Sequence, residues 1–354
     1  IDLNNKNILV IGAGKIALRK VETLMSYNCN ILIITKDILE EKFLELEKNN
    51  KIKIFNKNLK WRENFKMQDN CEKNKKMEFL ENVKILENKA VGGDNFLMRV
   101  KSENVPNKKS APVAGQFYML KLKNEIMILR RPISLHSVNS QTGEIEFLYK
   151  VLGKGTKELA SYAKGDVINI QGPLGNGFEL IKKSSKIVIV GGGIGLAPLK
   201  QLLKELLKNK ENKKIVFIAG GRDKKTLEML DSFDFSDKRI SLKVCSDDGS
   251  VGEKANIIEL LKKEISIDEK IDIIYSCGPH KVLELISELS NENNLTSQVS
   301  MEERMACGVG ACVGCSIPSE EGMKKVCKNG PVFYSKIFGK KSENVKNGGE
   351  LNGK

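Results

Sequence analysis

Two short apolar runs near the amino terminus flank a stretch with helical spacing. Residues 7–11 (NILVI) and 31–35 (ILIIT) each predict a β-strand. Between them a helical pattern extends over residues 15–26. Strand, helix and strand in this order predict a partial Rossmann-like βαβ segment over residues 1–60.

The pattern changes twice in the next part of the chain. An amphipathic helix is predicted over residues 37–48, and the charged, aperiodic residues 61–76 are typical of a linker. Residues 77–181 hold short β-rich runs between Gly, Pro and Asn, which predicts a small antiparallel β-barrel. The runs are NFLMRV, QFYMLKL, IMILRR, IEFLYKVL and DVINIQG.

Strands alternate with helices over residues 182–295, which predicts a parallel, doubly wound α/β domain. Its helices are predicted at residues 196–208, 224–231, 253–264 and 280–290. A small cysteine-rich domain is predicted at 296–338, and the polar residues 339–354 predict a disordered tail. The chain is therefore expected to be multidomain.

Composition narrows the function classes. Hydrophobic residues make up 40% of the 354 positions, enough for two or three cores. The net charge of +14 is carried almost entirely by Lys, since only eight of the 59 basic residues are Arg. No basic block is interleaved with aromatic residues, so nucleic-acid binding is not expected.

The sequence also predicts the compartment. No run of about 18 apolar residues occurs, so no membrane span is expected. The first residues lack the features of a signal peptide, which predicts a cytoplasmic, reducing environment. In a reducing compartment, clustered cysteines are more often metal ligands than disulfide partners. The chain opens on Ile rather than Met, which leaves its natural start open.

Four of the eight cysteines lie close together in the sequence. The spacing of Cys307, Cys312, Cys315 and Cys327 is C-x4-C-x2-C-x11-C, which is that of plant-type [2Fe–2S] loops. Tight turns, and N–H groups directed at sulfur, are expected from the glycines between them, Gly308, Gly310 and Gly314. Zinc is an alternative, although zinc ribbons favour two CxxC pairs and only one is present. The third interpretation is that the four thiols bind no metal.

Two motifs in the predicted barrel suit a phosphate-bearing redox cofactor. RRPISL places Arg131 and Ser134 after an apolar run; a guanidinium can hold a diphosphate, and a hydroxyl can face a flavin ring. GKGT places Gly155 and Thr156 directly before a helix predicted at 156–162, whose first N–H groups suit a second phosphate contact. Each motif also fits a purely structural role, as a strand end or as a capped turn.

Two further motifs suit a dinucleotide in the α/β domain. In VGGGIG, glycines 192, 193 and 195 allow the backbone to approach a diphosphate at a helix start. YSCGP places Cys277 at the carboxyl edge of the sheet, where ligands bind in such folds. Cys277 also fits as a small buried residue, and His280 is interpreted as a surface or helix-start residue.

In this order, RPIS, GxGT, GDVINIQGPLGNGF, GGGIGLAPL, CGP and the cysteine motif closely resemble the electron transfer subunit of dihydroorotate dehydrogenase B, a ferredoxin reductase-like flavoprotein family. The resemblance covers about residues 77–338. It implies an FAD-binding barrel, an NAD-binding α/β domain and a [2Fe–2S] domain. The implied FAD contacts are Arg131, Pro132, Ile133, Ser134, Leu148, Tyr149, Lys150, Gly155 and Thr156. The implied NAD contacts are Gly192, Gly193, Gly195, Cys277, Gly278 and Pro279, and the implied cluster ligands are Cys307, Cys312, Cys315 and Cys327.

The resemblance also implies a function in pyrimidine biosynthesis. An FMN-containing catalytic subunit would oxidise dihydroorotate, in a heterotetramer of two plus two subunits, and electrons would pass through the cluster and FAD to NAD+. Ser134 near flavin N5 and Cys277 near the nicotinamide are the catalytic candidates. Two alternatives remain open. One is a related flavin and [2Fe–2S] subunit, of a sulfide dehydrogenase or a ferredoxin:NAD(P) reductase. The other is a non-catalytic zinc-binding module.

A different resemblance covers about the first 60 residues. NKNILVIGAGKIALRKVETLMSYNCNILIIT is similar to precorrin-2 dehydrogenase, the NAD-binding part of sirohaem synthase. Gly12, Gly14 and Ala17 supply its glycine pattern, and Asp37 is a candidate ribose ligand. The other strands and the carboxylate-bearing loop of that enzyme do not follow. A βαβ unit cannot cover both faces of its sheet, so we expect a truncated fusion that docks elsewhere or is loosely structured.

Overall fold

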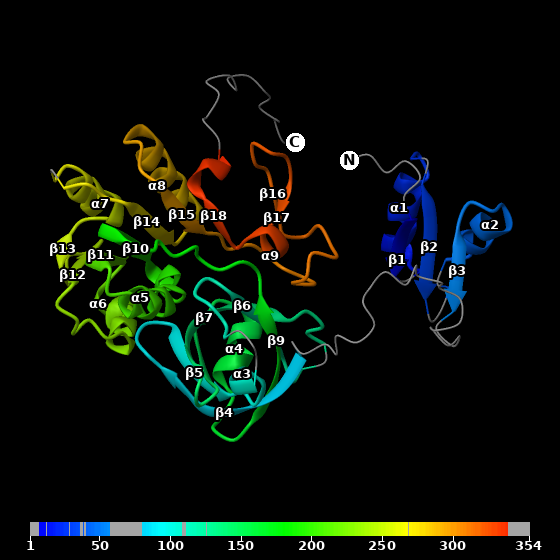
Figure 1. Cartoon of the computed structure of the whole chain (residues 1–354). Helices are drawn as coiled ribbons and strands as arrows, with labels where there is room; N and C mark the ends of the chain where they lie inside the picture. The colour runs from blue at the N-terminus through cyan, green and yellow to red at the C-terminus, as the bar shows by residue number, and fades with distance from the viewer. Residues whose placement is uncertain are drawn as a thin grey trace. The chain divides into compact units, whose positions relative to one another are not determined.

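The computed structural model describes residues 7–11, 13–27, 29–35, 38, 40–56, 80–107, 111–124, 126–267 and 269–338. The predicted linker and tail, together with Gly12 and Asp37, lie outside the described residues. The chain divides into two units, residues 1–76 and residues 77–354 (Figure 1).

The amino-terminal unit is a parallel sheet in the order β1–β2–β3 with two helices. Its elements are β1 (Asn7–Ile11), α1 (Lys15–Leu24), β2 (Asn30–Thr35), α2 (Lys42–Lys48) and β3 (Lys53–Asn56). Strand β3 was not predicted, so the segment is βαβαβ rather than βαβ. Apolar side chains of the sheet and both helices form its core, among them Val10, Val21, Ile31, Ile33, Phe43 and Leu46.

Antiparallel strands close a barrel in the order β4–β5–β8–β7–β6–β9. They are β4 (Leu80–Ala90), β5 (Asn95–Lys101), β6 (Phe117–Lys121), β7 (Arg131–Asn139), β8 (Glu144–Lys150) and β9 (Val167–Leu174). Strand β4 was missed because polar residues interrupt its apolar ones, yet Val83 and Ile85 are buried in the barrel core. Two short helices, α3 (Asn104–Asn107) and α4 (Lys154–Ala160), belong to the same domain.

The strand predicted at IMILRR is wrong. Residues 126–130 form the connection between β6 and β7, and the strand begins only at Arg131. Ile126 and Ile128 are 88% and 86% exposed. The chain has to reverse after β6, and the Asn124 side chain accepts a hydrogen bond from the Ile126 amide (2.9 Å) in that turn. Arg131–Ser134 therefore opens β7 instead of ending a strand.

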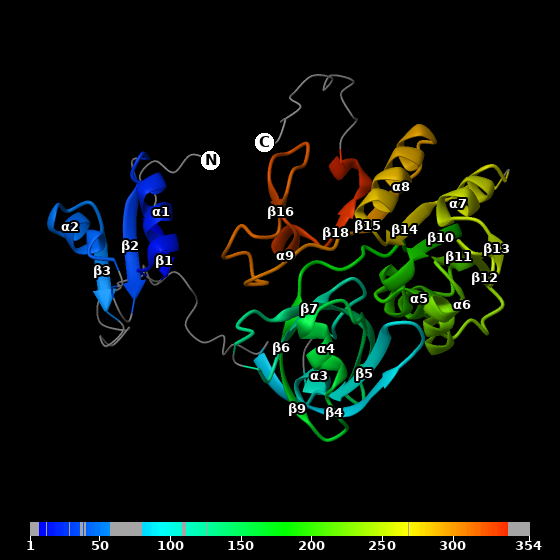
Figure 2. The same ribbon diagram turned by 180° about the vertical axis from the view of Figure 1, so that it is seen from behind.

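The α/β domain is built on a sheet in the order β13–β12–β11–β10–β14–β15–β18, parallel except for β18. Its strands are β10 (Ser184–Gly192), β11 (Asn212–Gly221), β12 (Ile240–Ser246), β13 (Glu253–Lys254), β14 (Ile273–Cys277), β15 (Ser297–Ser300) and β18 (Val332–Tyr334). Strand β18 follows the cysteines in the sequence, so the cysteine-rich segment is anchored to the edge of this sheet (Figure 2). The rest of that segment forms β16 (Ser316–Ile317), β17 (Lys324–Lys325), α9 (Val326–Asn329) and η3 (Ser335–Phe338).

Helices cover both faces of the sheet. The barrel-side face carries η1 (Gly193–Leu196), α5 (Leu199–Lys208), α6 (Lys224–Leu227) and η2 (Glu228–Ser232); the other carries α7 (Ile257–Ile265) and α8 (His280–Glu292). Side chains alternate between the faces, as a strand dictates. Ile187 and Ile189 pack on the barrel side, and Val188 and Val190 pack on the other. None of the described helices combines the length and apolar content needed to cross a bilayer.

Candidate functional site

An open pocket lies where the barrel, the glycine loop after β10 and the segment before the cysteines meet. Strands β7 and β8 and the start of α4 supply most of the barrel wall. Seven of the nine predicted FAD residues line this pocket: Pro132, Ile133, Ser134, Leu148, Tyr149, Lys150 and Thr156. The fold thus brings three separate stretches of sequence to one cavity.

The other two, Arg131 and Gly155, are in contact with each other. A Cβ on Gly155 would lie 2.1 Å from Arg131 Nε, so only glycine leaves room for the guanidinium over the first turn of α4. Helix α4 begins at Lys154 rather than at 156, which places Gly155 and Thr156 within that turn. First-turn N–H groups have no partner within a helix. Together with a guanidinium they are a suitable donor set for a diphosphate.

Thr156 shapes the turn before α4. Its hydroxyl accepts hydrogen bonds from the Leu152 and Gly153 amides (2.9 and 3.2 Å) and donates to the Gly153 carbonyl (3.2 Å). These bonds use the donor and both acceptor positions of a hydroxyl. Thr156 therefore has only its backbone N–H and its methyl group to offer to a ligand in the pocket.

Tyr149 supports the pocket wall. Its ring stacks on Phe96, with centroids 6.0 Å apart, and its hydroxyl donates to Asn88 Oδ1 (3.0 Å). Burial raises the pKa of this phenol, so Tyr149 stays neutral. Ser134 differs because it is only half-buried, and it is therefore the hydroxyl on this wall best placed to meet a ligand.

The predicted dinucleotide residues also come together, at the carboxyl ends of β10 and β14. A Cβ on Gly195 would lie 2.5 Å from the Cys277 carbonyl oxygen, and one on Gly192 would lie 3.8 Å from Pro279 Cδ. Gly193 has φ +54°, a conformation that favours glycine. Ile194 and Ala197, from the same loop, line the pocket described above. The glycine loop and the barrel site are therefore adjacent.

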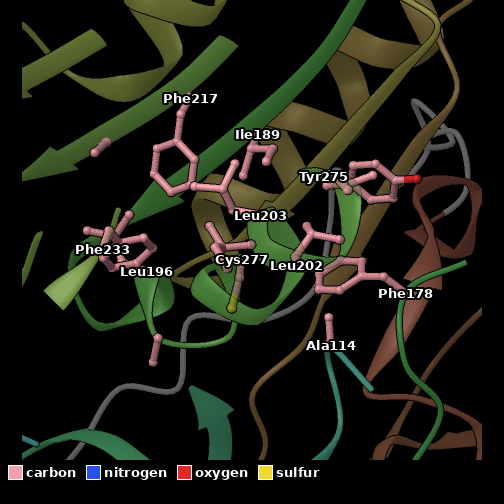
Figure 3. Packing of buried hydrophobic residues seen from close by; sticks show 14 of the residues in the cluster. Ala114, Phe178, Ile189, Leu196, Leu202, Leu203, Phe217, Phe233, Tyr275 and Cys277 are labelled. Carbon is pink, nitrogen blue, oxygen red and sulfur yellow. The ribbon is translucent and has the colours of Figure 1, made fainter. Parts of the chain in front are cut away.

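Cys277 is buried in the apolar cluster beneath the glycine loop, with Leu196 nearby (Figure 3). Burial raises the pKa of its thiol, and the Glu302 carboxylate raises it further. The thiol is therefore protonated and offers a weak donor, not a nucleophile. The exposed His280 begins α8, as the sequence indicated.

Sequence reasoning missed one side of the pocket. Ser300 ends β15, Met301, Glu302 and Glu303 follow it directly, and all four line the cavity. Glu302 is exposed to the pocket, yet the protein around its carboxyl displaces water and raises its pKa. The only signal was the position of MEER just before the cysteine motif.

The four cysteines lie as two pairs. The Cys312 amide donates to Cys307 Sγ (3.4 Å), and the Cys327 amide donates to Cys315 Sγ (3.5 Å). Within the described residues, no three Cys, His, Asp or Glu side chains converge as one metal ion would need. Two thiol pairs suit a two-iron cluster, in which each iron takes two ligands, better than a single tetrahedral zinc ion.

Backbone donors surround these sulfurs. Gly308 and Gly310 have φ +69° and +78°, and the Gly310 amide donates to Cys327 Sγ (3.1 Å). Burial alone would raise the pKa of the Cys307 thiol, but amides including that of Cys312 lower it to about 7. At Cys307 the loop therefore stabilises negative sulfur, as cluster ligation requires. At Cys327 burial and the Cys315 side chain outweigh the Gly310 amide and raise the pKa of the thiol to about 12.

Comparison with family models agrees with this division of the chain. Residues 82–178 match an oxidoreductase FAD-binding domain, and residues 189–288 match an oxidoreductase NAD-binding domain. Residues 302–338 match the iron–sulfur cluster binding domain of dihydroorotate dehydrogenase B. Residues 1–88 match an NAD(P)-binding model. The chain is thus an oxidoreductase subunit with FAD, NAD and iron–sulfur domains.

A solved structure of an NADH-dependent reduced ferredoxin-NADP oxidoreductase, described for flavin-based electron bifurcation, is similar in fold. Its TM-score is 0.64 at 26% identity, over 72% of this chain and 88% of that one. A ferredoxin reductase of carbazole 1,9a-dioxygenase, at 15% identity and TM-score 0.53, shares the fold alone. The antiparallel barrel followed by an α/β domain is therefore a ferredoxin reductase-like architecture.

Curated relatives give the family. An electron transfer subunit of dihydroorotate dehydrogenase B (NAD(+)) from Clostridium perfringens is 38% identical over 221 residues, covering 62% of this chain and 84% of the relative. The subunits from Desulforamulus reducens and Streptococcus pneumoniae R6 are 38% and 31% identical, covering 66% and 72% of this chain and 88% and 96% of those proteins. The chain therefore belongs to the family of electron transfer subunits of NAD(+)-dependent dihydroorotate dehydrogenase B.

Proposed function

We propose that this chain accepts electrons from an FMN-containing, dihydroorotate-oxidising catalytic subunit and delivers them to NAD+, in a cytoplasmic heterotetramer of two plus two subunits. The overall reaction balances as dihydroorotate plus NAD+ giving orotate, NADH and a proton. One observation carries the proposal. The same pocket is bounded by the barrel, by the glycine loop and by the segment that leads into the cysteines.

Different residues would bind FAD and NAD(H). Arg131 and the first turn of α4 would hold the FAD diphosphate, and Ser134 would contact the ring. The glycine loop with Cys277, Gly278 and Pro279 would bind NAD(H). When bound, a [2Fe–2S] centre supplies one-electron transfer and FAD links it to two-electron hydride chemistry. The chain itself orients both ligands and encloses them.

An anaerobic preparation of the full chain tests this assignment. We expect FAD, two iron atoms and two labile sulfides per chain, a brown-yellow colour, and bleaching of the visible spectrum by NADH. A colourless, zinc-loaded protein would contradict it. The structural likeness to the ferredoxin-NADP oxidoreductase favours one second candidate, a related reductase subunit. Reduced ferredoxin, and not dihydroorotate with its catalytic subunit, would then supply the electrons.

The amino-terminal unit has a separate role under this proposal. We regard it as a truncated relative of precorrin-2 dehydrogenase, supported by its βαβαβ order and its glycine turn before α1. Residues 77–354 alone should then retain flavin, iron and NADH oxidation. A large loss of any of these in that fragment would give the unit a part in folding or cofactor binding.

A further inference from the structure

A histidine is completely buried between the barrel and the α/β domain. His136, on β7, is 0% exposed. Its Nδ1 lies 2.7 Å from the Ala197 carbonyl oxygen, and its Nε2 lies 3.0 Å from Ser232 Oγ. Its ring meets Phe233 edge-on, with centroids 5.5 Å apart. One barrel side chain therefore contacts both the loop after β10 and the end of η2.

The His136 side chain lies on the outer face of the barrel, at a β-bulge. Leu135 pairs with Phe147 and Ser137 pairs with Glu146, so His136 is the extra residue in β7. Because Leu135 and Val138 both pack in the barrel core, the bulge leaves His136 and Ser137 side by side on the outer face. Bulges of this kind are frequent beside active sites. Leu135 remains in the barrel core, whereas His136 faces the neighbouring domain.

The partners fix the position of the ring proton. A carbonyl oxygen only accepts, so Nδ1 carries the hydrogen and donates to Ala197. Nε2 is then an acceptor facing the Ser232 hydroxyl (3.0 Å), whose one hydrogen is shared between Nε2 and the Met229 carbonyl oxygen (2.7 Å). Burial, reinforced by Lys200 and Lys204, lowers the pKa of His136 to about 3, so the ring stays neutral. The bond to Ala197 is thus a fixed, directional contact.

Ala197 links this contact to the site. Ala197 follows η1 immediately, at the end of the glycine loop, and it lines the pocket in which FAD is proposed to bind. The next helix, α5, is also tied to the barrel: the Val138 amide donates to Gln201 Oε1 (3.0 Å), and Lys200 Nζ pairs with Glu146 (2.7 Å). The helix is therefore held along its length, and His136 holds the loop at its start.

Resting on the function proposed above, we propose that His136 is a positioning residue that sets the glycine loop relative to the flavin wall through the Ala197 carbonyl. Ser134, on that wall, is two residues from His136 on the same strand. A shift at the bulge would therefore move the loop and the wall relative to each other. Hydride transfer depends on such alignment, and a displacement of about 1 Å costs on the order of 100-fold in rate.

Two amide variants of His136 distinguish the effect of its hydrogen bond to the Ala197 carbonyl from the effect of filling a buried position. The side-chain amide N–H of His136→Asn replaces Nδ1–H and keeps the donor to Ala197, whereas His136→Gln reaches toward Ser232 in place of Nε2. The first assay follows the reduction of bound flavin by saturating NADH in an anaerobic stopped-flow instrument. The second measures steady-state NADH oxidation with ferricyanide as the electron acceptor, which takes one electron per molecule. We expect His136→Asn to stay within about threefold of wild type and His136→Gln to fall about 10- to 100-fold, at equal FAD content. Equal rates for the two variants would overturn the proposal.

Two further readouts do not depend on activity. The chain has two histidines, so a His280→Gln variant assigns the ¹⁵N imidazole signals. The His136 signals should show the Nδ1–H tautomer at neutral pH; an Nε2–H tautomer would contradict the contact. Amide hydrogen exchange over residues 193–197 should accelerate in His136→Gln and not in His136→Asn. If wild type fails to oxidise NADH, the proposed function fails, while these two measurements still decide the contact.

Discussion

The guanidinium of Arg131 lies directly over the Cα of Gly155, so that a Cβ at position 155 would approach Nε to 2.1 Å. Arg131 opens β7 and Gly155 sits in the first turn of α4. The contact joins two motifs that are separate in the sequence, and the neighbouring residues Pro132 and Thr156 line the pocket.

Gly155→Ala should weaken FAD binding without removing any donor. The added methyl group displaces the guanidinium, and charge-assisted hydrogen bonds of this kind contribute about 1.5–3 kcal/mol, or about 10- to 100-fold in affinity. Flavin occupancy is read from absorbance after dilution and filtration. Gly153→Ala is the matched control, since nothing lies within 4 Å of a Cβ there. Equal flavin retention in both variants would argue against a phosphate site at this turn.

Cys312→Ala should remove the iron–sulfur cluster and leave the flavin site intact. The loss of one sulfur from the Cys307/Cys312 pair should remove the cluster, whereas the flavin pocket contains none of the four cysteines. We expect iron to fall to near zero and NADH-to-ferricyanide activity to stay within about twofold, because hydride transfer does not use the cluster. Cys245→Ala, a buried cysteine outside the motif, is the control and should keep its iron. A parallel loss of NADH oxidation in Cys312→Ala would reject this separation.

Local features of this chain could be predicted from its sequence, and contacts between domains could not. The cysteine spacing and the glycine turns were readable because their geometry is local: four thiols and positive-φ residues lie within one short segment. The contacts of His136 could not be predicted, because its partners Ala197 and Ser232 belong to another domain and are distant in the sequence. The strand predicted at Ile126 and Ile128 was wrong, because apolar composition alone does not distinguish a strand from an exposed connection.

Acid should destabilise the fold through His136. Its pKa is about 3 in the folded state and 6.5 without the fold, because burial and then Lys200 and Lys204 disfavour its charge. The unfolded chain alone takes up this proton between those values. The free energy of unfolding should therefore fall as pH drops below about 6.5, by up to about 1.4 kcal/mol per pH unit. Urea unfolding at pH 7.5 and pH 5 should show a smaller drop in His136→Asn; an identical drop would assign the acid sensitivity to other groups.

Breaking a buried ion pair in the α/β domain should destabilise that domain. Lys186 Nζ lies 2.6 Å from Glu264 Oε1, and the two side chains are 0% and 2% exposed. Burial alone would raise the pKa of Glu264, but hydrogen bonds from Lys186 and Lys243 hold it below its usual value. Lys186→Ala would leave the buried Glu264 carboxylate with Lys243 as its remaining partner, and should lower the free energy of unfolding in urea by up to about 3 kcal/mol. The double variant Lys186→Met, Glu264→Leu should recover most of that loss, and no recovery would contradict this account.

The most direct test of the proposed electron route uses two chains. The full chain is purified anaerobically with an FMN-containing dihydroorotate dehydrogenase catalytic subunit, dihydroorotate and NAD+ are added, and NADH is followed by absorbance. The account predicts one NADH per orotate, formed only when both chains are present and abolished by Cys312→Ala. NADH formation without the cluster, or none from the pair although NADH still bleaches the flavin, would contradict the route proposed here.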